Sequence, residues 1–314
     1  MEMGLHDSEC SLWPELRWPA GGSNVSENGL GGAPTALRMI LGKQLQALRE
    51  KAGLSYEQAA EAIYSSPWTV RRMERAEGGL KPLTVKGLLT AYGITEPREI
   101  DAFLSLSREA SKPGWWHSYN DVLPDWFRTF VGLEEAASSI RGYDPHWIPG
   151  LLQTADYAHA SVRTGFPDAT DSEAERRVAL RLARQQILNR PQPPRLWLVI
   201  DETAMRRPAA TTGASVMRAQ IGRMIEACQQ PNITVQILPF SAGLHPAMYG
   251  PFRIFRFDAE ELPDIVYAES MTSAYYIDKP DEAGEYGKAL DRICAQAAPA
   301  DATTGILTTI RKEI

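Results

Sequence analysis

A cluster of positive charge offers the clearest chemistry in this sequence, because three arginines fall within five consecutive positions: Arg71, Arg72 and Arg75. Each guanidinium presents a planar fork of N–H donors, which suits phosphate oxygens and the edge of guanine. On a helix, Val70 and Met73 would face the core, so Trp68 and Thr69 would project outward with the arginines. The pattern predicts a helix that contacts nucleic acid.

Two helix starts position this segment. Ser66 can cap a helix, and Pro67 follows at the first helical position, where its missing N–H costs nothing. Earlier in the chain, Ser55 precedes Gln58 in a capping-box arrangement, and the small pair Ala59-Ala60 allows the next helix to cross closely. Two short helices joined by a polar turn have the layout of a helix-turn-helix.

Amphipathic segments on both sides complete a helical domain. Upstream, an apolar stripe that ends before the left-handed C-cap Gly53 consists of Leu37, Leu41, Leu45 and Leu48. Downstream, residues 84–94 and 97–110 form two further amphipathic segments. We therefore predict an all-α domain of five helices over residues 35–112.

Residues 54–75 resemble the Xre-type helix-turn-helix family. The residues that carry the resemblance are Leu54-Ser55, Val70, Arg72 and Glu74-Arg75. The resemblance implies that Trp68 and Arg72 reach base edges, while Tyr56 and Arg71 lie nearer the DNA backbone. Trp68 keeps a second interpretation, because an aromatic residue at a helix start can instead pack on its own domain. The full set of candidate DNA-binding residues is Tyr56, Ser66, Pro67, Trp68, Thr69, Arg71, Arg72 and Arg75.

The same resemblance implies a structural ion pair between Arg49 and Glu74, partly buried and remote from the bases. It also shows two departures, since Tyr64 and Ala76 stand where the family usually or often has a turn glycine. A residue with a Cβ is strained in a left-handed conformation, so we expect strain at such a turn.

The charge distribution limits the strength of DNA binding. The whole chain carries a formal charge of −6, whereas residues 35–112 carry +3. A surplus this small gives one module a modest affinity for double-stranded DNA, so useful binding requires a homodimer on half-sites ~10 bp apart.

The 314 residues predict at least two domains, and 44% apolar composition can fill sizeable cores. No stretch reaches the roughly 18 apolar residues of a membrane span, and the acidic beginning lacks the features of a signal peptide, which favours the cytoplasm. The scattered Cys10, Cys228 and Cys294 encode neither a disulfide framework nor a zinc motif, and we expect no cofactor. Residues 1–34, rich in Gly, Ser, Asn and Pro, predict a disordered extension.

After residue 112 the composition changes. Residues 113–150 are dense in tryptophan and proline and predict a packed connection, and residues 151–314 predict a larger mixed α+β domain. The predicted helices of this domain are 171–190, 217–228 and 286–297, and its predicted strands are 195–200, 233–238, 252–257 and 264–269.

Residues 113–160, and PGLLQT-DYA within them, resemble the start of the large C-terminal domain behind Xre-type modules in regulators of filamentous actinobacteria, including WhiJ-like developmental regulators. The combined resemblance spans residues 35 to about 300. It implies a transcription factor, often antitoxin-like and commonly encoded beside a small partner protein.

The C-terminal half shows no pattern typical of catalysis. Its histidines are scattered and absent from known motif spacings, and Asp201-Glu202 lacks an evident acid/base partner, so we expect no enzyme. The tryptophans either line a pocket or, in the favoured interpretation, join the two domains: Trp115, Trp116, Trp126 and Trp147. An arginine run on one helix predicts a solvated face, with an acidic partner or DNA as alternatives: Arg176, Arg177, Arg181 and Arg184.

The favoured function is a sequence-specific DNA-binding transcriptional regulator with a C-terminal regulatory domain. The alternative is an antitoxin-like module that binds a small protein and for which DNA binding is secondary. No motif in the sequence identifies a small-molecule effector.

Overall fold

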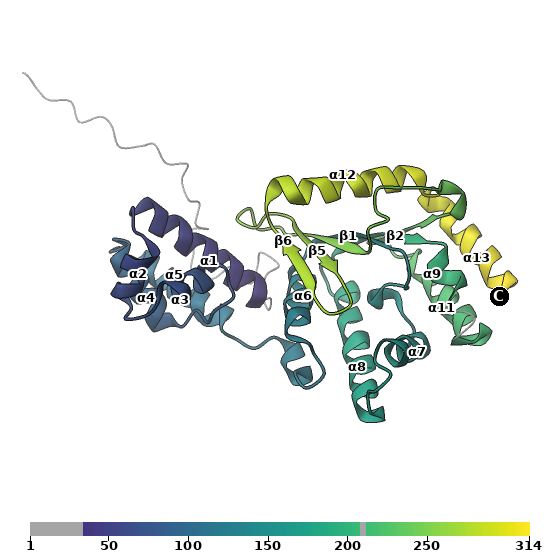
Figure 1. Cartoon of the computed structure of the whole chain (residues 1–314), viewed down its shortest axis with the longest axis horizontal. Coiled ribbons are helices and arrows are strands. Elements are labelled where there is room, and N and C mark those ends of the chain that lie inside the picture. Colours follow the sequence, from purple (N-terminus) through teal and green to yellow (C-terminus); the bar gives the residue numbers. More distant parts are fainter. Residues whose placement is uncertain (1–33, 208–211) are drawn as a thin grey trace, which may run out of the picture.

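The computed structural model describes residues 34–207 and 212–314, and the predicted extension at 1–34, with Cys10, lies outside them except for Pro34. The described part of the chain begins with a helical region of five α-helices (Figure 1). Their bounds are α1 Pro34–Lys51, α2 Tyr56–Ala62, α3 Pro67–Glu74, α4 Pro82–Ala91 and α5 Pro97–Ala110. The predicted five-helix arrangement is therefore confirmed.

A mixed α/β domain follows, which we call the sheet domain. Its described helices are α6 Asp125–Ala136, α7 Ala155–Gly165, α8 Asp171–Arg184, α9 Thr203–Arg206, α11 Ala214–Ala227, α12 Pro280–Gln296 and α13 Thr303–Glu313. Short 3-10 turns are η1 Trp115–Tyr119, η2 Gly150–Leu152, η3 Gln185–Asn189, η4 Phe240–Ala242 and η5 Ala300–Ala302. The strands are β1 Ser139–Asp144, β2 Arg195–Asp201, β3 Ile233–Leu238, β4 Phe252–Arg256, β5 Ile265–Glu269 and β6 Ala274–Ile277.

The six strands in the described residues form one mixed sheet with the order β3-β2-β1-β4-β5-β6. Strands β1, β2 and β3 are parallel, and helices connect them. Strands β4, β5 and β6 continue the sheet as an antiparallel meander beside β1. This change of direction follows from chain connectivity, because parallel neighbours need long crossovers and antiparallel neighbours need only turns.

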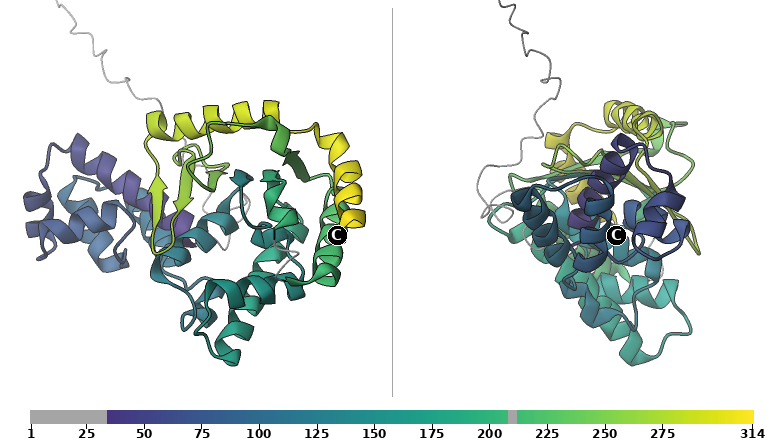
Figure 2. Two further views of the ribbon diagram at one scale, coloured as in Figure 1. Left: turned by 45° about the vertical axis from the view of Figure 1, so that its right-hand side comes forward. Right: turned by 90° about the vertical axis from the view of Figure 1, so that its left-hand side faces the viewer.

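Helices cover both faces of the sheet (Figures 1 and 2). On one face, α12 packs over a small apolar cluster that includes Val199, Ile254 and Leu290. On the other face, α6, α11 and α13 pack over a larger cluster, to which Ile237 and Phe255 contribute from the strands. Buried apolar residues alternate between the two faces in much of β2 and β3, as expected for parallel strands that lie between helices.

All the predicted strands of the sheet domain are confirmed, and its predicted helices match α8 with η3, α11 and α12. Two strands had no clear sequence signal. Strand β1 lies in the predicted connection 113–150 and occupies an interior position in the sheet, although its sequence SIRGYD is mixed in polarity. Strand β6 is a four-residue edge strand, too short to show a period.

The arginine run on α8 is not the solvated face that its sequence predicts. Arg176 pairs with Asp121 at 2.5 Å, Arg177 donates to the Val122 carbonyl at 2.7 Å, and Arg184 is buried. These side chains point toward η1, α6 and the segment between them. The error arose because the carboxylate and carbonyl partners lie far away in the sequence.

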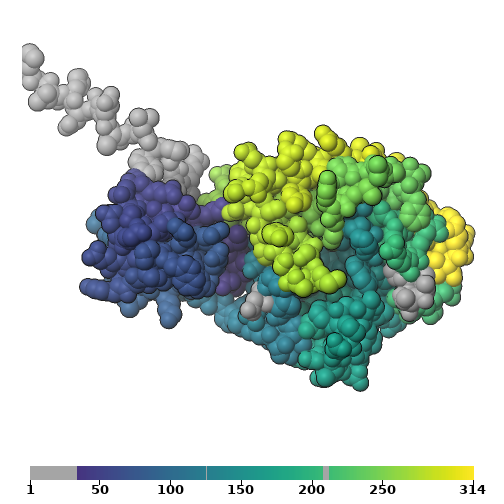
Figure 3. All heavy atoms as spheres, viewed as in Figure 1, coloured from purple at the N-terminus to yellow at the C-terminus, as the bar shows by residue number. Residues whose placement is uncertain are grey.

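The helical region joins the sheet domain through α1 and α6, and the helical region is a distinct lobe at one end (Figure 3). Gly132 on α6 lies so close to Thr35 on α1 that a Cβ at this position would collide with the threonine side chain. One continuous apolar cluster includes Leu41 of α1, Phe130 of α6 and Phe255 of β4. An exposed ion pair, Lys43 with Asp278 at 3.6 Å, adds little.

Substitution of Gly132 by Ala tests this junction. We expect Gly132→Ala to lower the free energy of unfolding by ~1–3 kcal/mol, because the new methyl group overpacks the contact with Thr35. The matched control is Gly284→Ala on α12, where nothing lies within 4 Å of the added Cβ. That control should raise the stability by ~0.5–1 kcal/mol through helix propensity. Urea denaturation of the full chain measures both, and equal effects would contradict the close α1–α6 packing.

Candidate nucleic-acid interface

The starts of α2 and α3 are fixed by the caps that the sequence predicts. Ser55 accepts a hydrogen bond from the Gln58 N–H at 3.3 Å, and the Gln58 side chain accepts one from the Ser55 N–H at 2.8 Å. Ser66 caps α3 by accepting from the Thr69 N–H at 3.2 Å, with Pro67 at the start of the helix. These side-chain caps satisfy backbone donors that have no partner inside the helix. Both helices therefore begin at defined residues.

The turns before and after α3 each contain a residue with a strained, left-handed backbone. Tyr64 has a φ of 50° and Ala76, just after α3, has a φ of 58°. Both are the positions where the related family usually or often has glycine, so the expected left-handed conformations are confirmed. Left-handed backbone costs a residue with a Cβ roughly 1–2 kcal/mol relative to the right-handed form.

The two faces of α3 differ as the sequence predicts. Val70 and Met73 are fully buried and fix the helix on the core. Trp68 is 65% exposed, and Arg71 and Arg75 are also exposed, on the side that faces solvent. The helix therefore presents an indole and several guanidinium groups without burying any of them in the domain.

Trp68 and Arg72 contact each other. The Arg72 guanidinium carbon lies 4.5 Å from the centroid of the Trp68 ring, and Arg72 Nη2 donates to the Glu77 carbonyl at 2.7 Å. The indole of Trp68 is 65% exposed and packs on an arginine of its own helix, so its contact with DNA bases stays a prediction. The stacked and hydrogen-bonded guanidinium is held in place before any ligand arrives, which lowers the entropy cost of its contacts.

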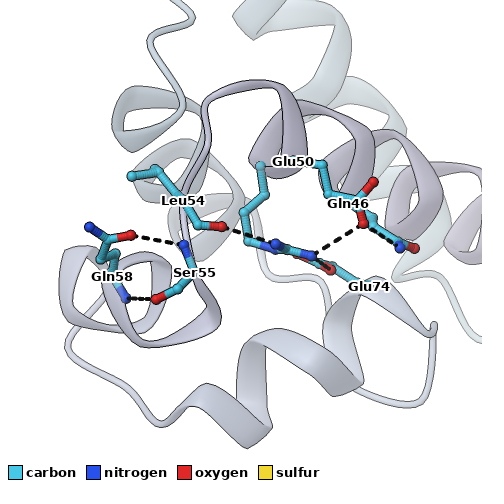
Figure 4. A network of polar contacts seen from close by, with 7 residues as sticks. Gln46, Glu50, Leu54, Ser55, Gln58 and Glu74 are labelled. Atoms are coloured by element: carbon cyan, nitrogen blue, oxygen red, sulfur yellow. Dashed lines mark hydrogen bonds and ion pairs between the residues drawn. The ribbon is translucent and has the colours of Figure 1, made fainter.

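Behind this face, Arg49 of α1 and Glu74 of α3 form a buried bidentate ion pair. Arg49 Nε and Nη2 donate to the two Glu74 carboxylate oxygens at 2.7 and 2.9 Å, and the side chains are 8% and 1% exposed. Arg49 Nη1 also donates to the Leu54 carbonyl at 3.0 Å, beside the Ser55–Gln58 cap (Figure 4). The hydrogen bond to Glu74 raises the pKa of Arg49. The pair thus ties α1, α3 and the start of α2 together.

Tyr56 links the ion pair to the exposed face. Its ring centroid lies 4.0 Å from the Arg49 guanidinium carbon and 4.9 Å from that of Arg71. The structure therefore brings Tyr56 and Arg71 together at the edge of α3. Arg75 lies at the other end, where its Nε is 3.6 Å from Glu77 Oε1, and both side chains are more than half exposed.

One residue of the exposed face was missed as a contact candidate. Tyr64 is fully exposed in the turn that precedes α3, where its ring extends into solvent. The sequence signal was present, because a tyrosine replaces a turn glycine at that point, but it was interpreted only as a source of strain.

Two family models match the chain. A model described as a helix-turn-helix domain matches residues 40–103, which include α2 and α3. A second, described as a domain of unknown function, DUF5753, matches residues 127–309, more than half of the chain. The chain belongs to the DUF5753 family. No curated protein and no solved structure matches the chain.

Within the DUF5753 domain, the structure brings together residues that the sequence leaves scattered. The Tyr143 hydroxyl lies 3.4 Å from Asp201 Oδ2 and 3.3 Å from His245 Nε2, at the ends of the parallel strands β1 and β2. Burial, and then Asp201, raise the pKa of Tyr143, so its phenol stays neutral. Glu202 is held apart by Arg206 at 2.6 Å and the Phe240 N–H at 3.2 Å. These contacts join the ends of β1 and β2 to the loop that carries His245.

Other predicted features can be placed briefly. Cys228 and Cys294 are free thiols, and burial raises the pKa of both. In the described ranges, no group of three or more His, Cys, Asp or Glu side chains is arranged to hold a metal ion. None of the helices in the part of the chain that the structure covers has the length and apolar character needed to span a membrane. His146 and His159 are exposed.

Removal of Arg49 alone tests the buried ion pair. We expect Arg49→Met to lower the free energy of unfolding of the helical region by ~3–5 kcal/mol, because Glu74 is then left buried without a cation. The double variant Arg49→Met with Glu74→Leu should recover most of the loss, since it removes both charges. Chemical denaturation followed by circular dichroism measures both variants. A double variant as unstable as the single one would contradict an uncompensated charge as the cause.

A glycine at position 76 tests the turn strain. We expect Ala76→Gly to raise the stability by ~0.5–1 kcal/mol, because glycine adopts the observed φ of 58° without a steric penalty. Ala47→Gly is the matched control, since Ala47 is exposed in the middle of α1 and the change should lower stability by ~0.5–1 kcal/mol. Melting temperatures that fall in both variants would show that Ala76 is unstrained.

Proposed function

We propose that this protein is a sequence-specific DNA-binding transcriptional regulator that acts in the cytoplasm. In this proposal α3 enters the major groove of double-stranded DNA, and the DUF5753 domain is a regulatory domain without catalytic activity. The matched helix-turn-helix model suggests DNA binding. The proposal goes beyond DNA binding in two respects: α3 recognises particular bases, and the bound protein regulates transcription.

The single observation that carries the proposal is the preorganised outer face of α3. Trp68 and Arg72 stack at 4.5 Å on the solvent side, while Arg49 and Glu74 fix the helix from behind. An arginine held at a defined position can donate two parallel hydrogen bonds to guanine O6 and N7, which discriminates against other bases. Arg71 and Arg75 flank it and suit phosphate oxygens.

The modest charge of the helical region supports a homodimer as the binding species. Exposed carboxylates lie near the arginines: Glu57 on α2 interacts with Arg71, and Glu77 lies beside Arg75. One module therefore makes few net phosphate contacts, and two modules on adjacent half-sites would double them.

A specific observation favours a second candidate function, an antitoxin-like module that binds a small protein. The loop between β3 and β4 exposes four large apolar side chains: Phe240, Leu244, Met248 and Tyr249. Large apolar side chains that are exposed close together in one loop favour a protein-interaction site. Two results together would favour this candidate: a small protein co-purifies through contacts with this loop, and the full-length chain shows no sequence-selective DNA binding.

Selection of bound genomic fragments tests the primary proposal. We expect the full-length protein to enrich a small set of related sequences at near-physiological salt. Arg72→Ala should weaken binding to the selected site by ~1–3 kcal/mol and relax the preference at one or two base positions. Arg71→Ala should weaken binding to all sequences alike and reduce the salt dependence by about one phosphate contact.

The control is Arg292→Ala, which removes the same charge from the exposed surface of α12. It should leave both affinity and preference unchanged. Unchanged operator preference in Arg72→Ala would show that α3 does not read bases in this register, and an equal loss in all three variants would indicate only nonspecific electrostatic binding.

A further inference from the structure

A small pocket lies in the DUF5753 domain between α6, α8 and the end of β5. Its volume is about 130 Å³, and its apolar walls include Trp126 and Phe127 from α6 and Phe166 from the segment after α7. Leu180 of α8 adds aliphatic surface. The pocket is therefore lined with aromatic rings and lies apart from the face of α3.

Three arginines of α8 line one side of this pocket: Arg177, Arg181 and Arg184. Their spacing of four and three residues places them on one face of the helix. Only one of them forms a close carboxylate pair in the described structure. Arg184 donates to Glu134 through Nε at 2.7 Å and Nη2 at 2.8 Å, and both side chains are buried. The negative charge of Glu134 therefore neutralises the positive charge of Arg184.

Arg181 is held differently, because its hydrogen-bond partners are neutral. Arg181 Nη1 donates to Gln153 Oε1 at 3.1 Å and to Ser161 Oγ. Burial, with a further contribution from the neighbouring Arg184, lowers the pKa of Arg181 to about 10. A cation removed from water and matched only with neutral acceptors is costly unless something compensates for it.

Arg177 also keeps unused donor capacity. Its guanidinium carbon lies 3.9 Å from the Phe166 ring centroid, and Nη1 donates to the Val122 carbonyl at 2.7 Å. Its Nε is buried and lacks a hydrogen-bond partner. Burial lowers the pKa of Arg177 as well. Two partly desolvated guanidinium groups thus border the same apolar pocket.

We propose that this pocket binds a small aromatic carboxylate, whose ring lies among Trp126, Phe127 and Phe166 and whose carboxylate accepts hydrogen bonds from Arg181 and Arg177. The volume is close to the roughly 150 Å³ of a cavity that holds benzene, so the pocket admits at most a single ring. Among the described lining residues, Glu269 is the one acidic group. Against Arg177 and Arg181 it leaves one net positive charge, which matches a monoanion better than a doubly charged phosphate.

The pocket shares a helix with the domain junction. Trp126 and Phe127 line the pocket from α6, and the same helix packs on α1 through Gly132 and Thr35. Tyr276 of β6 donates to the Trp126 carbonyl at 2.5 Å, so the first turn of α6 is also tied to the sheet edge. An occupant of the pocket would fix the position of α6 and, through α1, would change the affinity of the helical region for DNA. This effect on DNA affinity rests on the proposed function.

Calorimetric titration of the full-length protein with sodium benzoate tests the binding site itself. We expect saturable binding with one site per chain and a raised melting temperature, whereas the neutral control benzyl alcohol should give neither. Arg181→Met should reduce benzoate affinity ~10-fold or more, because a charged hydrogen bond is lost. Arg176→Gln is the matched control on the same helix, since Arg176 pairs with Asp121 outside the pocket, and it should bind benzoate as the wild type does.

Stability separates a binding role of Arg181 from a structural one. Arg181→Met should keep or raise the melting temperature of the protein without benzoate, because it removes a desolvated charge. A lowered melting temperature together with unchanged benzoate affinity would overturn the proposal. So would the absence of saturable benzoate binding to the wild type, or tighter binding of phenyl phosphate than of benzoate. Benzoate binding without DNA binding would leave the pocket supported and the regulator hypothesis contradicted.

Discussion

The buried ion pair between Arg49 and Glu74 is the interaction on which the presentation of α3 depends. A helix of eight residues is too short to be stable alone, and its N-terminal cap and two buried apolar residues fix only part of its orientation. The bidentate geometry fixes the rotation of α3 relative to α1, because both carboxylate oxygens must meet their donors. Such a pair contributes little net stability compared with apolar residues, but its loss on one side is costly. The main effect of the Arg49–Glu74 pair is therefore to fix one orientation of α3 relative to α1, and its net contribution to the free energy of unfolding is small.

The sheet domain repeats this arrangement. Arg184 and Glu134 form a second buried bidentate pair, which joins α8 to α6 as the first pair joins α1 to α3. In both domains another arginine on the helix that carries one partner has no carboxylate of its own: Arg72 beside Glu74, and Arg181 beside Arg184. The paired residue sets the helix position, and the neighbouring arginine is left able to bind something else. Arg72 lies on the solvent side of α3, whereas Arg181 lines a pocket of about 130 Å³.

Local signals were sufficient to predict most of the helical region. The caps at Ser55 and Ser66 depend on contacts within a few residues, and the spacing of Val70 and Met73 places them on the inward face of one helix, whereas the left-handed positions 64 and 76 were expected from the family resemblance. Strand β1 could not be predicted in this way, since its polar positions are satisfied by Asp291 and by neighbouring strands far along the chain. The partners of the α8 arginines were hidden for the same reason. Asp121, Val122 and Glu134 precede their arginine partners on α8 by 55, 55 and 50 residues, and only the fold shows that they lie beside this helix.

The connection between the two arginine sites is α6 and not a flexible tether. Its apolar residues belong to the same buried cluster as those of α1 and the sheet, so the helical region cannot turn relative to the sheet domain without separating packed side chains. Packed interfaces of this kind respond to a perturbation by switching between discrete arrangements more readily than by bending. Gly132 permits the close approach of α6 to α1, and Glu134, two residues later, fixes α6 to α8. Helix α6 therefore contacts both α8, which lines the pocket, and α1, which carries Arg49.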